Sequence, residues 1–215
     1  MITRIKGSDL VKNAETPVFK LILIGGLSSL GSALMAELLK RQHEVIAVVD
    51  DLNTLAPRPG LHFKIGGLNS AAQAEQSVAG GSAVVCLLTA LAPDDFAAQL
   101  RMSQALIAGM SLTTIRRLLL VGDFSVLDTN EGHSKQQHDC AEQIVDALQR
   151  SQLQWTLVNM PQQVAGLGIE HFHHTHGTLE PGLAEPLQRL ARVAAGMVDS
   201  LELKLHIGEH VNFVC

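Results

Sequence analysis

Short apolar runs rich in Val, Ile and Leu alternate along the chain with longer segments in which apolar residues recur at helical spacing. The short runs are typical of strands buried on both faces of a parallel sheet, and the longer segments are typical of helices that cover it. The predicted strands are 18–25, 44–50, 61–66, 83–89, 115–122 and 154–160, with a seventh within 203–214. The predicted helices are 29–41, 70–79, 94–109, 135–151 and 186–200.

The regular alternation of strand and helix predicts an α/β fold: a Rossmann-like, doubly wound, mostly parallel sheet with helices on both faces. We expect residues 1–17 to form an N-terminal extension and residues 18–215 to form a single domain. The stretch 165–186 is rich in glycine, proline and histidine and interrupts this rhythm. It is expected to form a loop or small lid on the substrate side.

The amino-acid composition and charge limit the classes of protein to which this chain can belong. Of the 215 residues, 47% are apolar and 17% are charged, which is typical of a packed globular domain. The apolar run 83–92 is about half of what a bilayer crossing needs, so no membrane partner is expected. The net charge of −5, with Lys and Arg widely spread, argues against a nucleic-acid partner. Three scattered cysteines and no secretory signal favour the cytoplasm.

A glycine motif, LILIGGLSSLG, spans residues 21–31 at the junction of the first strand and first helix. Glycines there let the backbone approach a pyrophosphate, and the helix N-terminus offers it N–H groups. Ser28 stands at the middle glycine position, where its Cβ adds bulk and its hydroxyl could donate to phosphate. The alternative is a tight turn without a ligand. The predicted cofactor contacts here are Gly25, Gly26, Leu27, Ser28, Ser29, Leu30 and Gly31.

Two aspartates, Asp50 and Asp51, follow the second strand, about twenty residues beyond Gly31. A carboxylate at this position accepts hydrogen bonds from the adenosine ribose and repels a 2′-phosphate. The predicted cofactor is therefore NAD rather than NADP, although Arg58 in the next loop could still reach a phosphate. The alternative is that both aspartates only solvate a turn.

The order of these motifs resembles the atypical short-chain dehydrogenase/reductase group, in particular small NmrA-like NAD(P)-binding proteins of the flavin/biliverdin reductase B type. The resemblance runs from Phe19 to Phe213 and includes FKIGGLNSAAQAEQSVAGGSAVVCLLT, IRRLLLVGDFSVLD, LQRSQLQWTLVNMP and HIGEHVNF. It implies a reductase that uses a dinucleotide cofactor and a small-molecule acceptor, and a homodimer is compatible with it. Further cofactor contacts are expected at Gly67, Leu68, Leu88 and Thr89.

The sequence also departs from the family pattern. Because the chain has no tyrosine, it lacks the Tyr-x-x-x-Lys pair, in which the tyrosine donates a proton and the lysine lowers its pKa. Depending on the alignment, the pair falls on Ser134 and His138 or on Gln137 and Ala141. Glycine stands at position 67, where the family has an aspartate that contacts adenine. Asp50 stands where NADP-dependent members carry arginine, and the resemblance therefore implies a degenerate active site.

Residues after the later strands are the remaining candidates for chemistry. The family's serine position falls on Gly122 or Asp123, at the strand end that faces the ligand crevice. His133 and His138 flank the start of the long helix 135–151. We predict Asp123 and His138 as catalytic residues, with His138 as a general acid. The alternatives are a turn cap for Asp123 and an ordinary surface position for His138. The predicted substrate contacts are Phe124, Ser125, Met160, Pro161, Gln162 and Gln163.

Four histidines lie close together in EHFHHTHG, a composition that can bind zinc. In an extended chain His171 and His173 point to one face, and His174 and His176 to the other. We therefore predict a solvated loop and no metal site.

Two functions remain open at this stage. The first is an NAD(P)H-dependent reductase that relies on cofactor positioning, with little acid catalysis from side chains. The second is a catalytically inactive dinucleotide-binding sensor or protein-interaction module, favoured by the missing Tyr and Lys.

Overall fold

The computed structural model describes residues 18–54, 56–129, 132–161, 164–173 and 182–213. The expected extension 1–17 lies outside the described residues, as do Gln162 and Gln163.

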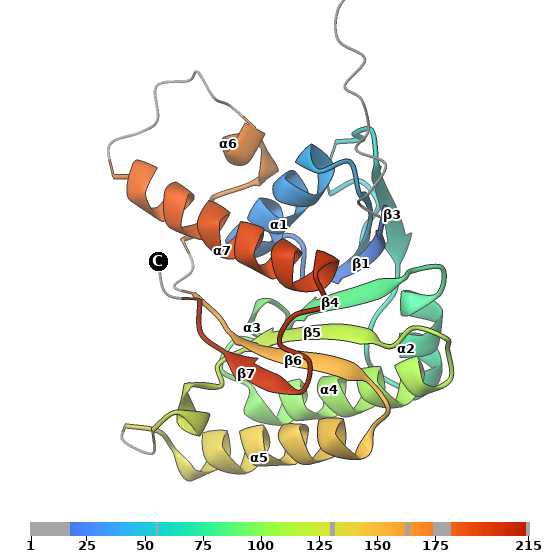
Figure 1. The fold of residues 1–215 in the computed structure, drawn as a ribbon, viewed down its shortest axis with the longest axis vertical. Coiled ribbons are helices and arrows are strands. Elements are labelled where there is room, and N and C mark those ends of the chain that lie inside the picture. Colours follow the sequence, from blue (N-terminus) through green and yellow to red (C-terminus); the bar gives the residue numbers. More distant parts are fainter. Residues whose placement is uncertain (1–17, 55, 130–131, 162–163, 174–181, 214–215) are drawn as a thin grey trace, which may run out of the picture.

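A seven-stranded sheet in the order β3-β2-β1-β4-β5-β6-β7 forms the middle of the molecule (Figure 1). Its strands are β1 (Lys20–Ile24), β2 (Glu44–Val49), β3 (Leu61–Ile65), β4 (Ala83–Leu87), β5 (Arg117–Gly122), β6 (Gln154–Asn159) and β7 (Glu209–Val211). All six strand pairings are parallel, so the prediction of a mostly parallel sheet becomes a fully parallel one. The strand order reverses between β1 and β4.

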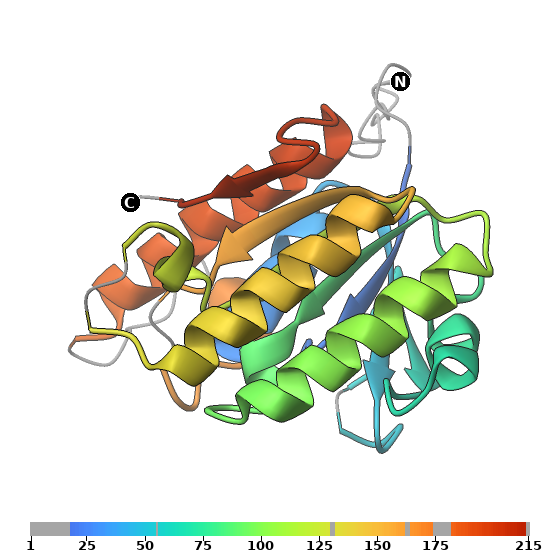
Figure 2. The ribbon, with the colours of Figure 1, turned by 90° about the horizontal axis from the view of Figure 1, so that it is seen from below.

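Helices cover both faces of the sheet, which confirms the predicted doubly wound α/β class (Figures 1 and 2). On one face lie α1 (Ser29–Lys40), α6 (Ile169–His173) and α7 (Ala184–Glu202). On the other lie α2 (Ala71–Val78), α4 (Phe96–Ser111) and α5 (Lys135–Arg150). The stretch expected as a loop or lid, 165–186, thus contains α6 and the start of α7. Within the described residues, no helix is both long and apolar enough to cross a membrane.

The predicted strand 83–89 is too long by two residues. Leu88 and Thr89 belong to a short helix, α3 (Leu88–Leu91). Leu88 is fully buried in this helix, so the run of apolar residues continues past the point where the strand ends. Apolar character alone therefore did not mark the boundary. A 3₁₀ turn, η1 (Ser125–Leu127), was also not predicted.

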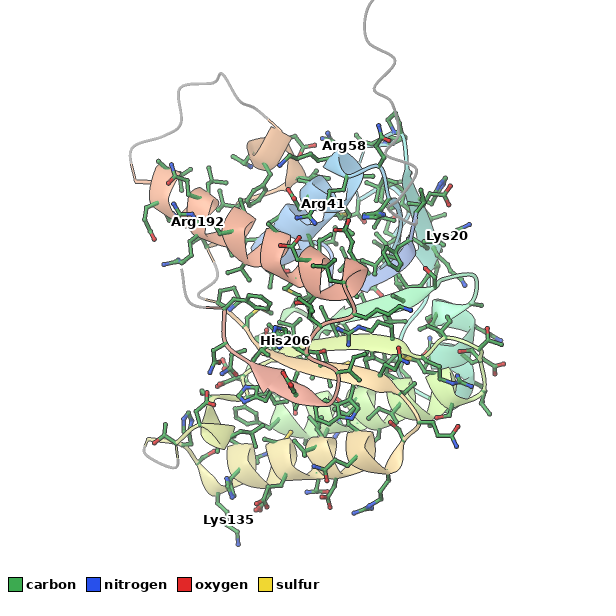
Figure 3. All side chains as sticks on the ribbon, in the orientation of Figure 1. Lys20, Arg41, Arg58, Lys135, Arg192 and His206 are labelled. Atoms are coloured by element: carbon green, nitrogen blue, oxygen red, sulfur yellow. The ribbon has the colours of Figure 1, made fainter. Side chains whose placement is uncertain are left out.

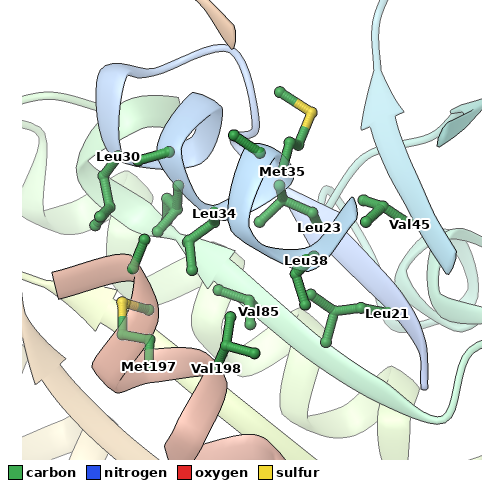
Figure 4. Packing of buried hydrophobic residues seen from close by; sticks show 14 of the residues in the cluster. Leu21, Leu23, Leu30, Leu34, Met35, Leu38, Val45, Val85, Met197 and Val198 are labelled. Atoms are coloured by element: carbon green, nitrogen blue, oxygen red, sulfur yellow. The ribbon is translucent and has the colours of Figure 1, made fainter. Parts of the chain in front are cut away.

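Side chains alternate strictly across the sheet and so divide the core into two layers. Leu21 and Leu23 of β1 join the layer beneath α1 and α7, whereas Ile22 and Ile24 join the layer beneath α2, α4 and α5. Figure 4 shows the first layer, in which α1 and α7 pack beside each other against the sheet. Its central residues are Leu30, Leu34, Leu38, Val85, Met197 and Val198. Burial of these apolar faces is the main stabilising contribution to the fold.

Arg41 joins the C-terminal ends of α1 and α7 (Figure 3). Its guanidinium donates to Asp199 at 2.6 Å, to Glu202 at 2.8 Å and to Glu37 at 2.8 Å. Partial burial disfavours the charged guanidinium, but the hydrogen bonds that it donates to these carboxylates raise the pKa of Arg41 above its ordinary value. Asp199 and Glu202 therefore hold α7 to the end of α1 at the amino-terminal edge of the sheet, while Glu37 holds the guanidinium from within α1.

Beside this network, His43 is buried between the first strand and α7. Its Nδ1 accepts the Phe19 N–H at 3.2 Å, so the ring proton of the neutral imidazole is on Nε2. That Nε2 lies 2.7 Å from the Glu202 carboxylate and donates to it. The chain entering β1 is thus tied to the end of α7.

Arg117 is a buried arginine at the start of β5, only 7% exposed. All of its hydrogen-bond acceptors within the described residues are neutral, namely Gln154 O, Thr156 Oγ1, Ser200 O and Leu205 O. Burial lowers the pKa of Arg117 to about 10, which leaves it charged at neutral pH. One side chain therefore connects β5, β6, α7 and the segment that leads into β7.

We predict that Arg117→Met lowers the free energy of unfolding by about 3 kcal/mol, because four buried acceptors lose a shared donor. Urea unfolding followed by circular dichroism measures this change. Arg150→Met is the control, since the Arg150 side chain is 78% exposed and pairs with Asp146 on the surface of α5. It should change stability by less than about 0.5 kcal/mol. Equal effects of the two substitutions would contradict the structural role of Arg117.

Candidate dinucleotide-binding site

A cleft of about 390 Å³ opens at the carboxyl edge of the sheet, where the strand order reverses. Parallel sheets bind ligands at such switch points because the loops on either side diverge and leave a crevice. The loops that follow β1, β2, β3 and β4 form its walls. The lining residues are Ile24, Gly25, Gly26, Leu27, Ser28, Val48, Val49, Asp50, Gly66, Gly67, Leu68, Asn69, Gln73, Ala90, Leu91 and Met102.

Two glycines allow the turn between β1 and α1 to form the floor of this cleft. Gly25 has a φ of +83°, and a Cβ there would lie 2.9 Å from the Leu87 carbonyl oxygen of β4. A Cβ on Gly31 would lie 2.5 Å from the carbonyl oxygen of Gly26. Both contacts involve backbone, which cannot move aside without disrupting the turn. The turn therefore requires glycine at positions 25 and 31.

Ser28 occupies the middle position of the motif without strain, at a φ of −71°. Its hydroxyl donates to the Gly25 carbonyl at 3.0 Å and accepts the Gly31 N–H at 3.1 Å. Ser28 is therefore the N-cap of α1 and bridges the two required glycines. The sequence suggested a hydroxyl aimed at phosphate, whereas the structure commits this hydroxyl to the turn itself.

The two aspartates after β2 have different environments. Asp50 is exposed and lines the cleft. Asp51 instead accepts hydrogen bonds from the backbone and side chain of Asn53, at 2.9 and 3.0 Å, and so closes a turn. Arg58 does not line the cleft, because its guanidinium pairs with Glu170 of α6 on the far side of α1 (Figure 3).

The other predicted cofactor contacts follow β3 and β4 and differ in their environments. Leu68 is 4% exposed and Leu88 is fully buried, and both belong to the core layer beneath α2 and α4. The Gly67 backbone is held by Ser77, whose hydroxyl accepts its N–H and donates to its carbonyl. Thr89 carries a buried hydroxyl with no hydrogen-bond partner among the described residues.

A second hollow, of about 630 Å³, adjoins the cleft at Leu27, Ser28 and Ala90. Its opposite wall is the segment 164–168, which follows β6. The backbone N–H of Val164 lies 3.4 Å from the Ser29 hydroxyl at the start of α1. The glycine turn thus separates two adjoining hollows along the carboxyl edge of the sheet.

Polar side chains gather after β5. In the sheet, β5 is the neighbour of β6, the strand that precedes the wall of the second hollow. The Ser125 hydroxyl donates to Asp123 at 2.5 Å and lies 3.5 Å from His133 Nε2. Because that hydroxyl has one proton, the His133 N–H is the donor in the second contact. Gln137 Nε2 lies 3.5 Å from the other Asp123 oxygen. His133 and Gln137, rather than His138, are thus next to Asp123.

The remaining predicted residues make other contacts. His138 pairs with Glu142 one turn further along α5, at 3.1 Å. Phe124 is only 2% exposed, and its ring meets His210 edge-on. Met160 and Pro161 follow β6 and are half-buried. No cluster of three potential metal ligands occurs among the described residues, which exclude His174 and His176.

Several lining residues were not predicted from the sequence. Ala90, Leu91 and Met102 come from α3 and α4, and Asn69 and Gln73 from the start of α2. Of these residues, only Gln73 had a signal in the local sequence. It stands three residues after the Ser70 N-cap, where Glu or Gln marks the start of a helix. The others reach the cleft through packing, which no short sequence pattern specifies.

This arrangement fits a dinucleotide. Two adjoining hollows flank the glycine turn, whose residues Gly25 and Gly26 line the cleft without side chains. Asp50 lines the cleft after β2, and Thr89, in the short helix α3 that follows β4, carries a hydroxyl with no partner among the described residues. Fold and site together define a dinucleotide-binding protein of the Rossmann type.

The chain belongs to the NAD(P)H-binding family, whose model matches residues 25–201. No curated protein matches it by sequence.

Solved structures share the fold over most of the chain. A proposed epimerase from Bacteroides thetaiotaomicron is 20% identical, with a TM-score of 0.66, and 91% of this chain and 96% of that chain are covered. A proposed NADH-flavin reductase from Streptococcus pneumoniae is 23% identical, with a TM-score of 0.61 and coverage of 90% and 98%. The Bordetella bronchiseptica enzyme WbmH, solved with NAD⁺, is 15% identical, with a TM-score of 0.63 and coverage of 91% and 75%.

We predict that Gly31→Ala lowers the free energy of unfolding by about 2 kcal/mol or more, since the added Cβ meets the Gly26 backbone. Helix propensity alone would give the opposite sign, a gain of up to about 1 kcal/mol. Urea unfolding measures the change. In the control Gly168→Ala, the nearest atom is a flexible Glu170 oxygen at 3.3 Å, so a small effect is expected. A stabilised Gly31→Ala protein would show that the close approach is not required.

Proposed function

We propose that this protein is an NADH-dependent reductase of the atypical short-chain dehydrogenase type, similar to the NmrA-like proteins. The observation that carries the proposal is the pair of adjoining hollows on either side of the glycine turn, with Asp50 at the outer end of one. One hollow suits the adenosine half of a dinucleotide, and the other suits the nicotinamide half and an acceptor.

The residues that line the cleft support NAD over NADP. None of the described lining residues is Lys, Arg or His, so a 2′-phosphate would have no cationic partner there. Asp50 would accept hydrogen bonds from the ribose hydroxyls and would repel a phosphate. The backbone at Gly25 and Gly26 would lie against the pyrophosphate, and the Thr89 hydroxyl, which has no partner among the described residues, would gain one.

When bound, the reduced nicotinamide supplies a hydride to the acceptor. The acceptor then needs one proton to complete its two-electron reduction. The contacts after β5 provide a route for this proton, from the His133 N–H to Ser125 and from Ser125 to Asp123. Asp123 thus has the role of the final carrier, and His133 exchanges protons with solvent. This route would substitute for the missing tyrosine.

The acceptor is proposed to be a small conjugated molecule such as a flavin or quinone. The likeness to a proposed NADH-flavin reductase supports this class. We also propose a cytoplasmic location. Cys86 and Cys140 are both free and buried, and burial raises the pKa of the Cys86 thiol to about 12, which suits a reducing compartment.

A second candidate is a catalytically inactive dinucleotide-binding sensor or protein-interaction module. The absence of tyrosine from the chain favours it, since the usual proton donor of such reductases is missing. NADH binding without reduction of any acceptor would support this candidate over the reductase.

We predict that the protein binds NADH at least about tenfold more tightly than NADPH, and that Asp50→Asn lowers this ratio because the repelling charge is removed. Quenching of Trp155 fluorescence or titration calorimetry measures both dissociation constants. Asp51→Asn is the matched control, as Asp51 points into its own turn and should leave the ratio unchanged. Failure to bind either dinucleotide would refute the proposed function.

We also predict that Asp123→Asn lowers kcat for NADH oxidation with flavin or quinone acceptors by about tenfold or more, because the proton route is interrupted. The dissociation constant of NADH should stay within about twofold of the wild type. Asp139→Asn, on the exposed surface of α5, serves as the control and should retain normal turnover. An unchanged kcat and pH profile in Asp123→Asn would exclude this proton route.

A further inference from the structure

The side chain of Gln73 occupies the part of the cleft wall that Gly67 leaves open. A Cβ on Gly67 would lie 3.0 Å from Gln73 Nε2 and 3.3 Å from its Oε1. The Gln73 amide therefore stands against the backbone at position 67, and it is one of the polar groups that line the cleft. Position 67 itself presents no side chain to a ligand.

The orientation of this amide is fixed by its surroundings. The Asn69 N–H donates to Gln73 Oε1 at 3.0 Å, which identifies the oxygen end of the amide. The backbone N–H of Gln73 donates to the hydroxyl of Ser70, the N-cap of α2, at 3.2 Å. The Ser77 hydroxyl lies 3.0 Å from the Gly67 carbonyl oxygen and 2.8 Å from the Gln73 carbonyl oxygen, and its one proton holds this part of the wall together.

The nitrogen end of the amide has no such commitment. Gln73 Nε2 makes no hydrogen bond to any part of the chain that the structure describes, and the residue is half-buried. An amide nitrogen carries two donors and no acceptor. The cleft wall at this point therefore offers hydrogen-bond donors, in contrast to the acceptor at Asp50.

We propose that Gln73 reads the nucleobase of the dinucleotide by donating a hydrogen bond from Nε2 to the adenine N1 acceptor. The inference rests on the proposed function, since it requires a dinucleotide in this cleft. Adenine has an unprotonated N1, whereas hypoxanthine carries a hydrogen at N1. A hypoxanthine base would bring its own donor toward the Gln73 donors and leave both without an acceptor.

Gln73→Glu separates base reading from a purely structural role. Glutamate retains an oxygen that can accept the Asn69 N–H, but it replaces the free donors with an acceptor. Its negative charge acts on the phosphates of both dinucleotides alike, so the ratio of the two affinities is insensitive to that charge. The ratio therefore reports the contact with the base.

The test measures dissociation constants of the full chain for NADH and for reduced nicotinamide hypoxanthine dinucleotide by titration calorimetry. The wild type should prefer the adenine form by about tenfold, the effect of one mismatched hydrogen bond. Gln73→Glu should reverse the preference, and Gln73→Met, which has no polar group, should bring the ratio close to one. Gln76→Glu, the same change on the exposed side of α2, should keep the wild-type ratio.

The outcomes distinguish the two levels of proposal. If the wild type binds neither dinucleotide, the proposed function fails and this inference fails with it. If the wild type binds both equally well, or if all variants keep the wild-type ratio, Gln73 does not read the base although the protein binds dinucleotides. The wild-type ratio alone can overturn the inference, so the result does not depend on how well a variant folds.

Discussion

The geometry of the site depends on the absence of a side chain at Gly31. This allows the first turn of α1 to rest against the Gly26 carbonyl, where a Cβ would be only 2.5 Å from the oxygen. The close approach fixes the direction of α1 as it leaves the sheet and thereby the space between the turn and β4. A Cβ on Gly25 would lie 2.9 Å from the Leu87 carbonyl oxygen of β4, so the cleft and the helix position arise from the same kind of steric constraint.

The departures from the usual glycine motif differ in physical meaning. Ser28 lies at a backbone conformation open to any residue, and its hydroxyl fastens the turn by two hydrogen bonds. The serine therefore preserves the shape that a third glycine would otherwise permit. The absence of tyrosine changes the chemistry of proton donation rather than the shape of the site, because the chain contains no phenol. A binding site can thus persist where the usual proton donor has gone.

The sequence specified the sheet and the principal helices because the buried strands and amphipathic helices are periodic over short distances. It also indicated the glycine turn and Asp50, whose spacing along the chain is set by one strand–helix–strand unit. Asp51 and His138 bind neighbours only two and four residues away, Asn53 and Glu142, and the sequence pattern did not distinguish these local contacts from a role in the site. Gln73 and His133 reach their sites from a helix start and a loop. The helix α6 was missed because it has only five residues, too few for its apolar pair Ile169 and Phe172 to reveal a helical period.

The ion pairs of Arg41 also bear on the order in which the chain can fold during synthesis. Arg41 and its partners Asp199 and Glu202 are separated by 158 and 161 residues, so almost the whole chain must be made before they can meet. Until α7 emerges from the ribosome, the side of α1 that packs against α7 has no cover. The nascent chain consequently carries an apolar surface for most of its synthesis, a period in which chaperone binding would favour correct folding.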